Sequence, residues 1–522
     1  MAGYARRGMV ATSQPLAAEA GLAVLRQGGN AVDAAVATAA ALTVLEPTSN
    51  GIGGDAFALI LHQGRLYGLN ASGPAPAALS ASALRARGHT SMPRFGWPPV
   101  TVPGAPRAWA DLCRRFGRLS LVRCLQPAID YAEWGYPLSP VVARGWQGAF
   151  IRYQHTLTGQ EFAPWFDTFA PQGRAPTEGE VWRSPDHART LRHIADSMAD
   201  DFYAGDLADR IDAFARNHGG FLRKSDLMAF QSQWVDPIQT TYRGYHVWEL
   251  PPNGQGVIAL LGLNILSHYE LERREAVDTY HYQIEALKLA MADCQAEITD
   301  PLWMPPDLIA TWLTSAYAAT KFAAIGKSAR DPGPQRLPGG GTVYLATADG
   351  EGNMVSYIQS NYMGFGSGLV VPGTGIALQN RGHLFSLNPQ AANFLEPGKR
   401  SYHTIIPAFL GQGAHYLGPF GVMGGLMQPQ AHLQVVSNVI DFHLNPQAAL
   451  DAPRWQWLEG QLVAVEPEVA PWIVDGLRAR GHRVEVRPDR ESFGRGQMIL
   501  RNAAGVLTGG TEGRADGGLA CW

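Results

Sequence analysis

Two hydroxyl residues flank a predicted β-hairpin in the last third of the 522-residue chain. Thr342 follows the glycine run Gly339–Gly341 and opens the segment TVYLATA, and the segment MVSYIQS returns after the turn DGEGN. A loop of five residues would pair Ala348 with Met354 and would place Thr342 opposite Ser360. Directly opposed residues have Cβ atoms about 4.5–5.5 Å apart, so these two hydroxyls could form a hydrogen bond.

Such a threonine could act as a nucleophile if the Gly341–Thr342 peptide bond were cut. The freed α-amine has an ordinary pKa near ~8 and lies on the nucleophile's own residue, where it can serve as the general base. No separate histidine is then needed. The alternative is an ordinary strand that begins after a loop, with Ser360 a partly buried strand residue, and spacing alone leaves both open.

A second candidate feature is the pair Gly424-Gly425 in the segment GVMGGLMQPQAHLQVV. Two glycines directly before a predicted helix present backbone N–H groups near its N-terminus, which suits an oxyanion hole for acyl transfer. A simple tight turn is the alternative interpretation of the same two residues.

The composition is that of a globular protein. Hydrophobic residues make up 46% of the chain and charged residues 17%, which excludes intrinsic disorder. The net charge of −3 lacks the basic excess that nucleic-acid binding needs, and no block of like charges suggests a membrane-surface segment. We therefore expect neither nucleic acid nor a membrane as a partner.

The expected compartment is the cytoplasm. The first residues, MAGYARRGMVATS, are not followed by the apolar segment of a secretory signal, and the apolar stretch Ala34–Leu45 is too short to span a bilayer. The four cysteines are too widely spaced for a CxxC pair, and a disulfide framework is not expected at that density. These features favour a reducing environment.

No cofactor and no metal are expected. The loop NGIGGD imitates part of a dinucleotide fingerprint, but a predicted helix precedes it instead of a strand. The chain contains no HExxH, P-loop or EF-hand motif, and its fifteen histidines form no close pair at metal-ligand spacing.

The elements that must position these residues change in character along the chain. Thr12 or Ser13 is predicted to cap a helix that begins near Pro15, and a second, apolar helix covers about 31–45. Residues 105–330 are mostly helical in pattern, including a long helix within 277–298, and TTYRGYHVWELPP is predicted as one strand. The Gly- and Pro-rich segment 331–341 predicts an exposed linker, and strands follow it, among them GLVVPGTGIAL, before a helix near 430–440.

From about residue 8 to 520 the chain resembles the gamma-glutamyltranspeptidase family of N-terminal-nucleophile hydrolases. The matching stretches occur in the family's order, which makes the resemblance specific. They are GGNAVDAAVA, GIGGDAF, VPGAP, QPAIDYA, YRGYHVWELPPNGQG, IEALKLAMAD, TVYLATADGEGNMVS, GTGIALQN, PGKRS, GGLMQPQ, DAPRW and GTEGRADGGLA.

The resemblance implies an α+β fold, a four-layer αββα sandwich, in a precursor that cuts itself before its nucleophile. Thr342 lies on the family's nucleophile, so the large chain would be 1–341 and the small chain 342–522, paired as an αβ heterodimer that could itself dimerise. Ser360 falls where the family carries a threonine that hydrogen-bonds the nucleophile. Gly424 and Gly425 fall on the family's oxyanion glycines.

The sequence departs from the family where the glutamate head of the substrate is bound. Ser72 stands in place of the arginine that clamps the α-carboxylate, and Tyr362 replaces an asparagine. Leu384, before Phe385, replaces the acidic residue that holds the α-amino group, and two serines become His403 and Thr404. A site stripped of these partners should discriminate against a charged amino-acid head.

The chain therefore resembles the family's non-glutamyl branch, which includes glutaryl-cephalosporin acylases and oxamate amidohydrolase, an intracellular enzyme of purine nitrogen salvage. Tyr362 would shrink the acyl pocket, which favours a short, carboxylate-bearing acyl amide such as oxamate. Arg381 and Arg400 are candidate carboxylate partners, although structural ion pairs explain them equally well. A γ-glutamyl hydrolase or transferase acting on glutathione, and an uncut, inactive binding protein, remain alternatives.

Overall fold

The computed structural model describes residues 1–332 and 340–522 and contains two seven-stranded antiparallel sheets. The predicted linker at 331–341 lies largely outside the described residues. Sheet I has the order β1 (Gly3–Ala5), β18 (Leu507–Thr511), β17 (Arg495–Arg501), β13 (His415–Met423), β12 (Ala408–Gln412), β9 (Tyr245–Glu249) and β8 (Ile238–Tyr242). Sheet II has the order β19 (Gly518–Cys521), β2 (Gly8–Thr12), β10 (Gly341–Asp349), β11 (Met354–Tyr362), β3 (Asp55–His62), β4 (Arg65–Ala71) and β7 (Gln233–Val235).

Two smaller sheets and the helices surround this pair. The smaller sheets consist of β14 (Trp455–Glu459), β15 (Leu462–Val465) and β16 (Arg483–Val486), and of β5 (Tyr136–Pro137) with β6 (Val181–Trp182). The helices are α1 (Pro15–Arg26), α2 (Ala31–Leu45), α3 (Ala81–Ala86), α4 (Ala105–Phe116), α5 (Leu121–Trp134), α6 (Pro140–Thr156), α7 (Ala163–Phe169), α8 (Pro185–Asp196), α9 (Asp200–Ala204), α10 (Asp206–Asn217), α11 (Lys224–Met228), α12 (Gly256–Leu266), α13 (Val277–Gln295), α14 (Leu308–Trp312), α15 (Ser315–Ala323), α16 (Gln428–Ile440), α17 (Pro446–Asp451) and α18 (Pro471–Ala479).

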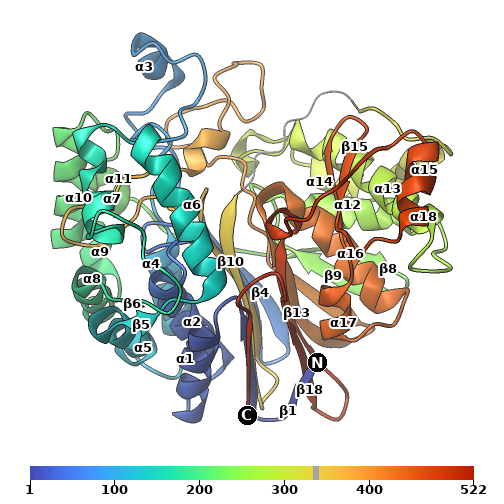
Figure 1. Cartoon of the computed structure of the whole chain (residues 1–522), viewed down its shortest axis with the longest axis horizontal. Helices are drawn as coiled ribbons and strands as arrows, with labels where there is room; N and C mark the ends of the chain where they lie inside the picture. The colour runs from blue at the N-terminus through green and yellow to red at the C-terminus, as the bar shows by residue number, and fades with distance from the viewer. Residues whose placement is uncertain (333–339) are drawn as a thin grey trace.

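The sheets stack face to face between two helical layers (Figure 1). Helices α1, α2 and α4 pack on the outer face of sheet II, and α12 and α16 pack on the outer face of sheet I. The predicted four-layer αββα sandwich is confirmed.

Side chains on the two faces of sheet II pack into two different apolar cores. On β10, Tyr344 and Ala346 join the apolar cluster between the sheets, whereas Val343 and Leu345 join the cluster under the helices. Side chains alternate between the faces of a strand, so a strand buried on both faces is a continuous apolar run. The inter-sheet cluster also contains Phe409 from sheet I.

Helix α2 shows why the N-terminal region was predictable. All fifteen of its residues are buried, which fits a composition of Ala, Val, Leu and Thr apart from Asp33 in the first turn. Asn30 caps it by accepting from the backbone N–H groups of Val32 and Asp33, and the Asp33 carboxylate accepts in return from the Asn30 N–H. The predicted range of 31–45 is therefore confirmed.

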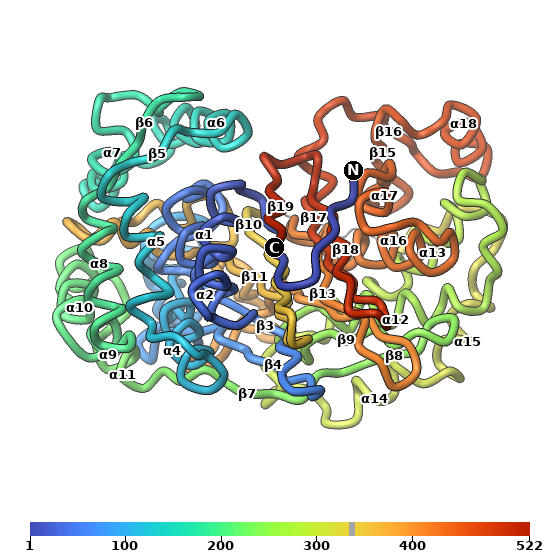
Figure 2. The backbone as a smooth tube through the Cα atoms, turned by 90° about the horizontal axis from the view of Figure 1, so that it is seen from below, coloured from blue at the N-terminus to red at the C-terminus, as the bar shows by residue number. Residues whose placement is uncertain are grey.

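Both sheets combine strands from the two sides of the Gly341–Thr342 bond. In sheet II, β10 lies between β2 and β11, and in sheet I, β9 pairs with β12. The chain ends lie close together, with Trp522 accepting a hydrogen bond from the Arg7 N–H, beside the end of β10 remote from Thr342 (Figure 2). Large and small chains cut at that bond would share one core.

Three local predictions were wrong. Helix α1 has Gln14 as its N-cap, with no side-chain cap, because Thr12 still belongs to β2 and Ser13 bonds Glu46. The segment TTYRGYHVWELPP forms a hairpin of β8 and β9, because Arg243 adopts a positive φ at its turn. The stretch GLVVPGTGIAL contributes only two isolated bridges, Val370 with Ala377 and Leu378 with Gly53, since Gly373 and Gly375 turn the chain at positive φ.

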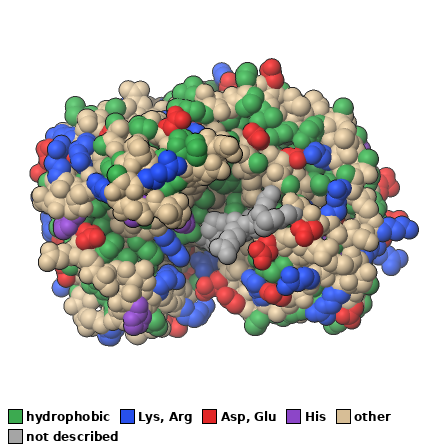
Figure 3. Space-filling model, turned by 90° about the horizontal axis from the view of Figure 1, so that it is seen from above, with side chains coloured by type: hydrophobic (Ala, Val, Ile, Leu, Met, Phe, Trp, Pro, Cys, Tyr) green, Lys and Arg blue, Asp and Glu red, His purple; other side chains and the backbone are tan. Residues whose placement is uncertain are grey.

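Over the described ranges 1–332 and 340–522, no helix combines the length and hydropathy needed to cross a bilayer. On the face seen in Figure 3, basic and acidic side chains are interspersed, as the near balance of 42 Lys and Arg with 45 Asp and Glu would suggest.

Candidate active site

The β10–β11 hairpin has the predicted register over most of its length. Ala348 pairs with Met354 and Val343 with Gln359. The pairing shifts by one residue at its open end, where Gly341 pairs with Tyr362, so Thr342 lies at an irregularity and not in the ladder. The predicted hydroxyl contact still forms, since Thr342 Oγ1 donates to Ser360 Oγ over 3.1 Å.

Ser360 is the centre of a small buried network. Its hydroxyl donates to the carbonyl oxygen of Gly341 over 2.7 Å, and it accepts from Thr342 and from the backbone N–H of Tyr362 at 2.7 Å. One donated and two accepted bonds use the full hydrogen-bonding capacity of a hydroxyl. Thr342 and Ser360 are 1% and 0% exposed, so water does not compete for these contacts.

Tyr362 adopts an unusual backbone conformation next to this network. Its φ is +74°, a region that costs a bulky residue free energy and that persists only where the surroundings enforce it. The enforcing contacts are the pairing with Gly341 and the bond from its N–H to Ser360. The Tyr362 ring is completely buried and its hydroxyl has no hydrogen-bond partner in the described part of the chain.

The Gly424-Gly425 pair forms the predicted turn before a helix. Gly424 and Gly425 have φ of +146° and +61°, and a short 3-10 turn leads from Gly425 into α16. A Cβ added to Gly340 would lie 3.4 Å from the Gly425 Cα and 3.0 Å from the Tyr362 carbonyl oxygen. The backbone just before Thr342 therefore passes between the Gly-Gly turn and the end of β11.

The Gly-Gly turn rests on a second backbone segment. A Cβ on Gly424, whose φ is +146°, would approach the Gly494 Cα to 3.1 Å, so a larger residue would strain the backbone and push the two segments apart. The Phe493 and Gly494 carbonyl oxygens accept from Arg454 at 3.0 and 2.9 Å. Arg454 thus holds the segment against which the turn packs.

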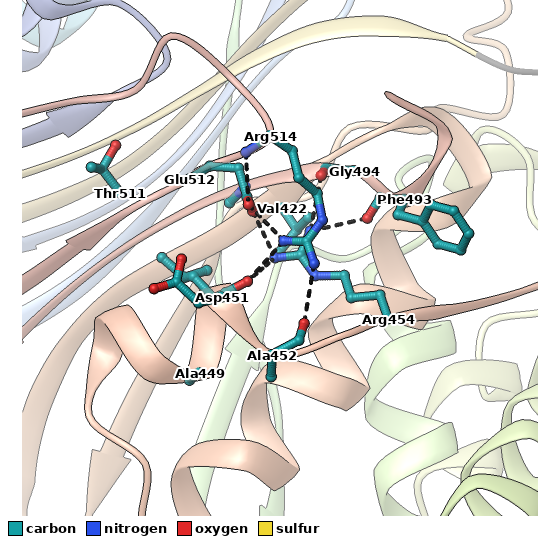
Figure 4. A network of polar contacts seen from close by, with 12 residues as sticks. Val422, Ala449, Asp451, Ala452, Arg454, Phe493, Gly494, Thr511, Glu512 and Arg514 are labelled. Atoms are coloured by element: carbon teal, nitrogen blue, oxygen red, sulfur yellow. Dashed lines mark hydrogen bonds and ion pairs between the residues drawn. The ribbon is translucent and has the colours of Figure 1, made fainter. Parts of the chain in front are cut away.

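Arg454 belongs to a buried ion network (Figure 4). Glu512 accepts from Arg454 and from Arg514, each at 2.7 Å, and Arg514 also pairs with Glu466 at 2.5 Å. Breaking such a pair leaves an uncompensated buried charge, which is strongly destabilising. The closing GTEGRADGG stretch and the DAPRW stretch meet here.

A carboxyl–imidazole pair lies on the neighbouring strand. Asp55 pairs with Ser360 across β3 and β11, and its carboxyl contacts His403 Nε2 at 2.9 Å and accepts from Gln379 at 2.8 Å. Burial raises the pKa of Asp55 to about 7, although Arg381 and Gln379 oppose the rise. Burial also lowers the pKa of His403 well below its usual range, so the imidazole is neutral at pH 7.

Arg381 and Thr404 lie together beside Tyr362. Arg381 Nη1 donates to Thr404 Oγ1 over 2.7 Å, and the guanidinium carbon lies 4.5 Å from the centre of the Tyr362 ring. Gln255 Nε2 donates to the Thr404 carbonyl oxygen over 2.6 Å and to that of Gly425 over 2.9 Å. Gln255 therefore ties the Arg381–Thr404 contact to the Gly-Gly turn.

Two of the other predicted positions are bound in structural networks. The Ser72 hydroxyl donates to Asn70 over 2.7 Å and accepts from Asn253 at 3.2 Å. Arg400 donates from Nε to the Ser72 carbonyl oxygen over 3.0 Å, and its terminal nitrogens contact the Gln233 side chain. Leu384 ends the 3-10 turn that Arg381 begins and packs against the apolar core.

Sequence reasoning missed Asp55, Gln379 and Gln255 as members of this site. Their signal was present, because GIGGDAF, GTGIALQN and PPNGQG are among the stretches that carry the family resemblance. It did not indicate which polar side chain in each stretch faces Thr342 or its neighbours.

Two groups of metal-capable side chains occur elsewhere in the described residues. Asp33 lies with Cys113 and Cys124, whose Sγ atoms are 3.9 Å apart, but its oxygens accept from several backbone N–H groups. His281 and His482 contact each other at 2.9 Å beside Glu285. Lys288 pairs with the Glu285 carboxylate at 2.8 Å, so an ammonium group already neutralises the charge of that carboxylate.

Comparisons with known proteins show which family the chain resembles over nearly its whole length. Residues 17–522 match the family model described as gamma-glutamyltranspeptidase. The chain is 37% identical to a glutathione hydrolase-like proenzyme of Bacillus subtilis, covering 98% of this chain and 97% of that one. It is 34% identical to an oxamate amidohydrolase proenzyme of Klebsiella pneumoniae, covering 98% of each. A crystal structure of a cephalosporin acylase from Bacillus halodurans superposes with a TM-score of 0.97 at 57% identity, over 100% of this chain and 97% of that one.

Proposed function

Because the chain belongs to the gamma-glutamyltranspeptidase family, we propose that it is a self-processing amidohydrolase whose nucleophile is the hydroxyl of Thr342. The single observation that carries the proposal is a pair of hydrogen bonds, from Thr342 Oγ1 to Ser360 Oγ and from Ser360 Oγ to the Gly341 carbonyl oxygen. It supplies a nucleophile and a polarised carbonyl on either side of one peptide bond. The word proenzyme in the names of two relatives supports the same reading.

Self-cleavage would use these groups directly. Thr342 Oγ attacks the Gly341 carbonyl carbon, and the Ser360 hydroxyl stabilises the negative charge that develops on the carbonyl oxygen. The C–N bond breaks, the hydroxyl proton passes to the Thr342 nitrogen, and an ester joins Gly341 to Thr342. Water then hydrolyses the ester and leaves a Gly341 carboxylate and a free Thr342 α-amine.

Turnover would repeat this chemistry on an external amide. The Thr342 α-amine takes the hydroxyl proton as Oγ attacks the amide carbon, and the N–H groups of Gly424 and Gly425 stabilise the tetrahedral oxyanion. The proton passes to the leaving nitrogen, ammonia or an amine departs, and a Thr342 acyl ester remains. Water cleaves that ester, which releases a carboxylic acid and restores the nucleophile.

The proposed substrate is a short acyl amide that carries a carboxylate, with oxamate as the smallest candidate. Tyr362, whose backbone N–H bonds Ser360 and whose side chain is completely buried, supports a small acyl group. The relative from Klebsiella pneumoniae is named for oxamate, and the neighbour from Bacillus halodurans is named for cephalosporins. Glutaryl and γ-glutamyl amides are the competing substrates.

The first test is the mass and N-terminal sequence of the purified protein. Cleavage as proposed gives chains of 341 and 181 residues, the shorter beginning Thr-Val-Tyr-Leu-Ala. Thr342→Ala should remain one chain and be inactive, whereas Thr342→Ser should retain some cleavage and turnover. A wild-type chain that stays whole after long incubation, and hydrolyses none of the three amide classes, would refute the proposal.

A further inference from the structure

Arg381 is a buried cation with unused hydrogen-bonding capacity. The residue is 1% exposed, and within residues 1–332 and 340–522 the only hydrogen-bond partner of its guanidinium is the Thr404 hydroxyl, which Nη1 contacts. Nε and Nη2 have no hydrogen-bond partner in the described part of the chain. A buried charged group without partners is costly, because it has lost its water and gained nothing in exchange.

The two free nitrogens are geometrically a pair. Nε and Nη2 lie on the same edge of the planar guanidinium, where their N–H bonds run parallel at the spacing of the two oxygens of a carboxylate. The third nitrogen, Nη1, is used to fix the group to Thr404. Arg381 therefore presents one complete, unoccupied fork for a bidentate anion.

The acidic group with the largest influence on Arg381 does not fill this fork. Asp55 is the main acidic influence on Arg381, but its oxygens are engaged by His403 and Gln379. Burial lowers the pKa of Arg381 to about 10, so the guanidinium is still charged at neutral pH. The positive charge is thus available to a ligand.

The fork is connected to both parts of the proposed catalytic machinery. The Tyr362 ring lies against the guanidinium, and the Tyr362 N–H bonds the hydroxyl of Ser360, which contacts Thr342. On the other side, Gln255 joins the carbonyl of Thr404 to the carbonyl of Gly425. A substrate carboxylate held by Arg381 would be oriented relative to the nucleophile and the Gly-Gly turn together.

We propose that Arg381 binds the carboxylate at the far end of the acyl group through Nε and Nη2 and so selects carboxylate-bearing acyl amides. The inference rests on the proposed function, because it assigns a recognition element to that same site. The sequence made Arg381 and Arg400 equal candidates for a carboxylate partner. The structure favours Arg381, because Arg400 already bonds Ser72 and Gln233.

The test compares two matched substrates on the mature enzyme. Glutaryl-p-nitroanilide and pentanoyl-p-nitroanilide have acyl chains of equal length that end in a carboxylate or a methyl group. Wild type should prefer the glutaryl compound, and Arg381→Gln should lower its kcat/KM about 10- to 100-fold while changing the pentanoyl value little. Arg381→Lys should recover only part of the loss, because an ammonium lacks the fork. Succinyl and butanoyl anilides repeat the comparison with a shorter acyl chain.

A surface control and a binding measurement complete the design. Arg174, which pairs with Glu180 and has a side chain 49% exposed, can be changed to Gln to remove one positive charge outside the site. Calorimetry with glutarate and oxalate should show binding to wild type and to Arg174→Gln, and at least tenfold weaker binding to Arg381→Gln, whatever the turnover.

The outcomes separate the two proposals. The role of Arg381 would be overturned if Arg381→Gln lowered kcat/KM equally for the carboxylate and the methyl substrate of a pair. Unchanged affinity of Arg381→Gln for the dicarboxylates would overturn it too, and neither result would bear on catalysis by Thr342. A wild-type enzyme that hydrolyses carboxylate and methyl substrates equally would do the same without any variant. A chain that is never cut and never turns over would instead refute the proposed function, and calorimetry would still decide whether Arg381 binds carboxylates.

Discussion

Ser360 donates a 2.7 Å hydrogen bond to the carbonyl oxygen of Gly341, the last carbonyl before Thr342. The same hydroxyl accepts from Thr342, so it touches both the attacking group and the group attacked. In the uncut chain Ser360 is therefore placed to assist peptide-bond cleavage, and after cleavage its proton would be free to turn toward the nucleophile.

Replacing Ser360 with Ala should slow self-cleavage about 10- to 100-fold, because a hydrogen bond to a developing negative charge is lost. Ser360→Thr should restore much of the rate, since it keeps the hydroxyl. The measurement is the uncut fraction over time by intact mass. Ser356→Ala is the matched control, because Ser356 lies on the same strand and bonds Tyr344 at 2.7 Å instead of Gly341. Equal cleavage rates in Ser360→Ala and wild type would remove this role.

Gly424→Ala should reduce kcat about 100-fold or more if the Gly-Gly turn supplies the oxyanion hole. A methyl group there would press on Gly494 and force the turn, with its N–H groups, to shift. Gly413→Ala provides a control, because Gly413 also has a positive φ, of +57°, but no atoms within 4 Å of an added Cβ. Steady-state kinetics and melting temperature should show that both variants lose stability while only Gly424→Ala loses kcat; an intact kcat would exclude the turn from catalysis.

Arg454→Met should lower kcat with little change in KM, because it frees the Phe493 and Gly494 carbonyls that support the turn. It should also cost about 3–5 kcal/mol of unfolding free energy, as breaking a buried ion pair does. Arg514→Met should cost a similar amount but spare kcat, since Arg514 contacts Glu466 and Glu512 and neither carbonyl. If the two variants lose kcat in proportion to stability alone, Arg454 has no positioning role.

The Asp55–His403 pair predicts an unusual pH dependence of stability. Asp55 has a pKa raised from 3.8 to about 7 in the folded state, and His403 has one lowered from 6.5. Alone, the raised carboxyl pKa contributes stability that is present below pH 3.8 and lost as pH rises toward 7. Alone, the lowered imidazole pKa contributes stability that is present above pH 6.5 and lost as pH falls.

Between pH 3.8 and 6.5 the pH dependences of these two contributions cancel. The folded pair holds one titrating proton, on Asp55, and the unfolded pair also holds one, on His403. Asp55→Asn removes the titrating carboxyl, so that only the pH dependence of His403 remains. The variant should then lose stability relative to wild type by about 1.4 kcal/mol per pH unit below pH 6.5. Urea unfolding from pH 7 to 5 measures the difference, and Asp55→Asn combined with His403→Gln should abolish the slope. Parallel curves for Asp55→Asn and wild type would contradict the coupling.

The sequence by itself determined the parts of the fold that depend on neighbours along the chain. The apolar run of α2 and the largely apolar segments of β10 and β11 are visible in the sequence, and the short DGEGN loop fixes the pairing of Ala348 with Met354. The same local logic placed a Gly-Gly turn before α16. The family resemblance added the four layers, which no local pattern specifies.

Only the tertiary structure decided which buried polar groups are satisfied. Asp55 meets His403 across 348 residues, and Gln255 reaches Gly425 across 170, through loops whose conformations depend on the packed sheets. From sequence, Arg381 and Arg400 are equivalent arginines. In the folded chain Arg400 is bound to its neighbours and Arg381 keeps one free edge, because satisfying a buried donor requires a partner at a specific distance and angle, which composition and spacing do not encode.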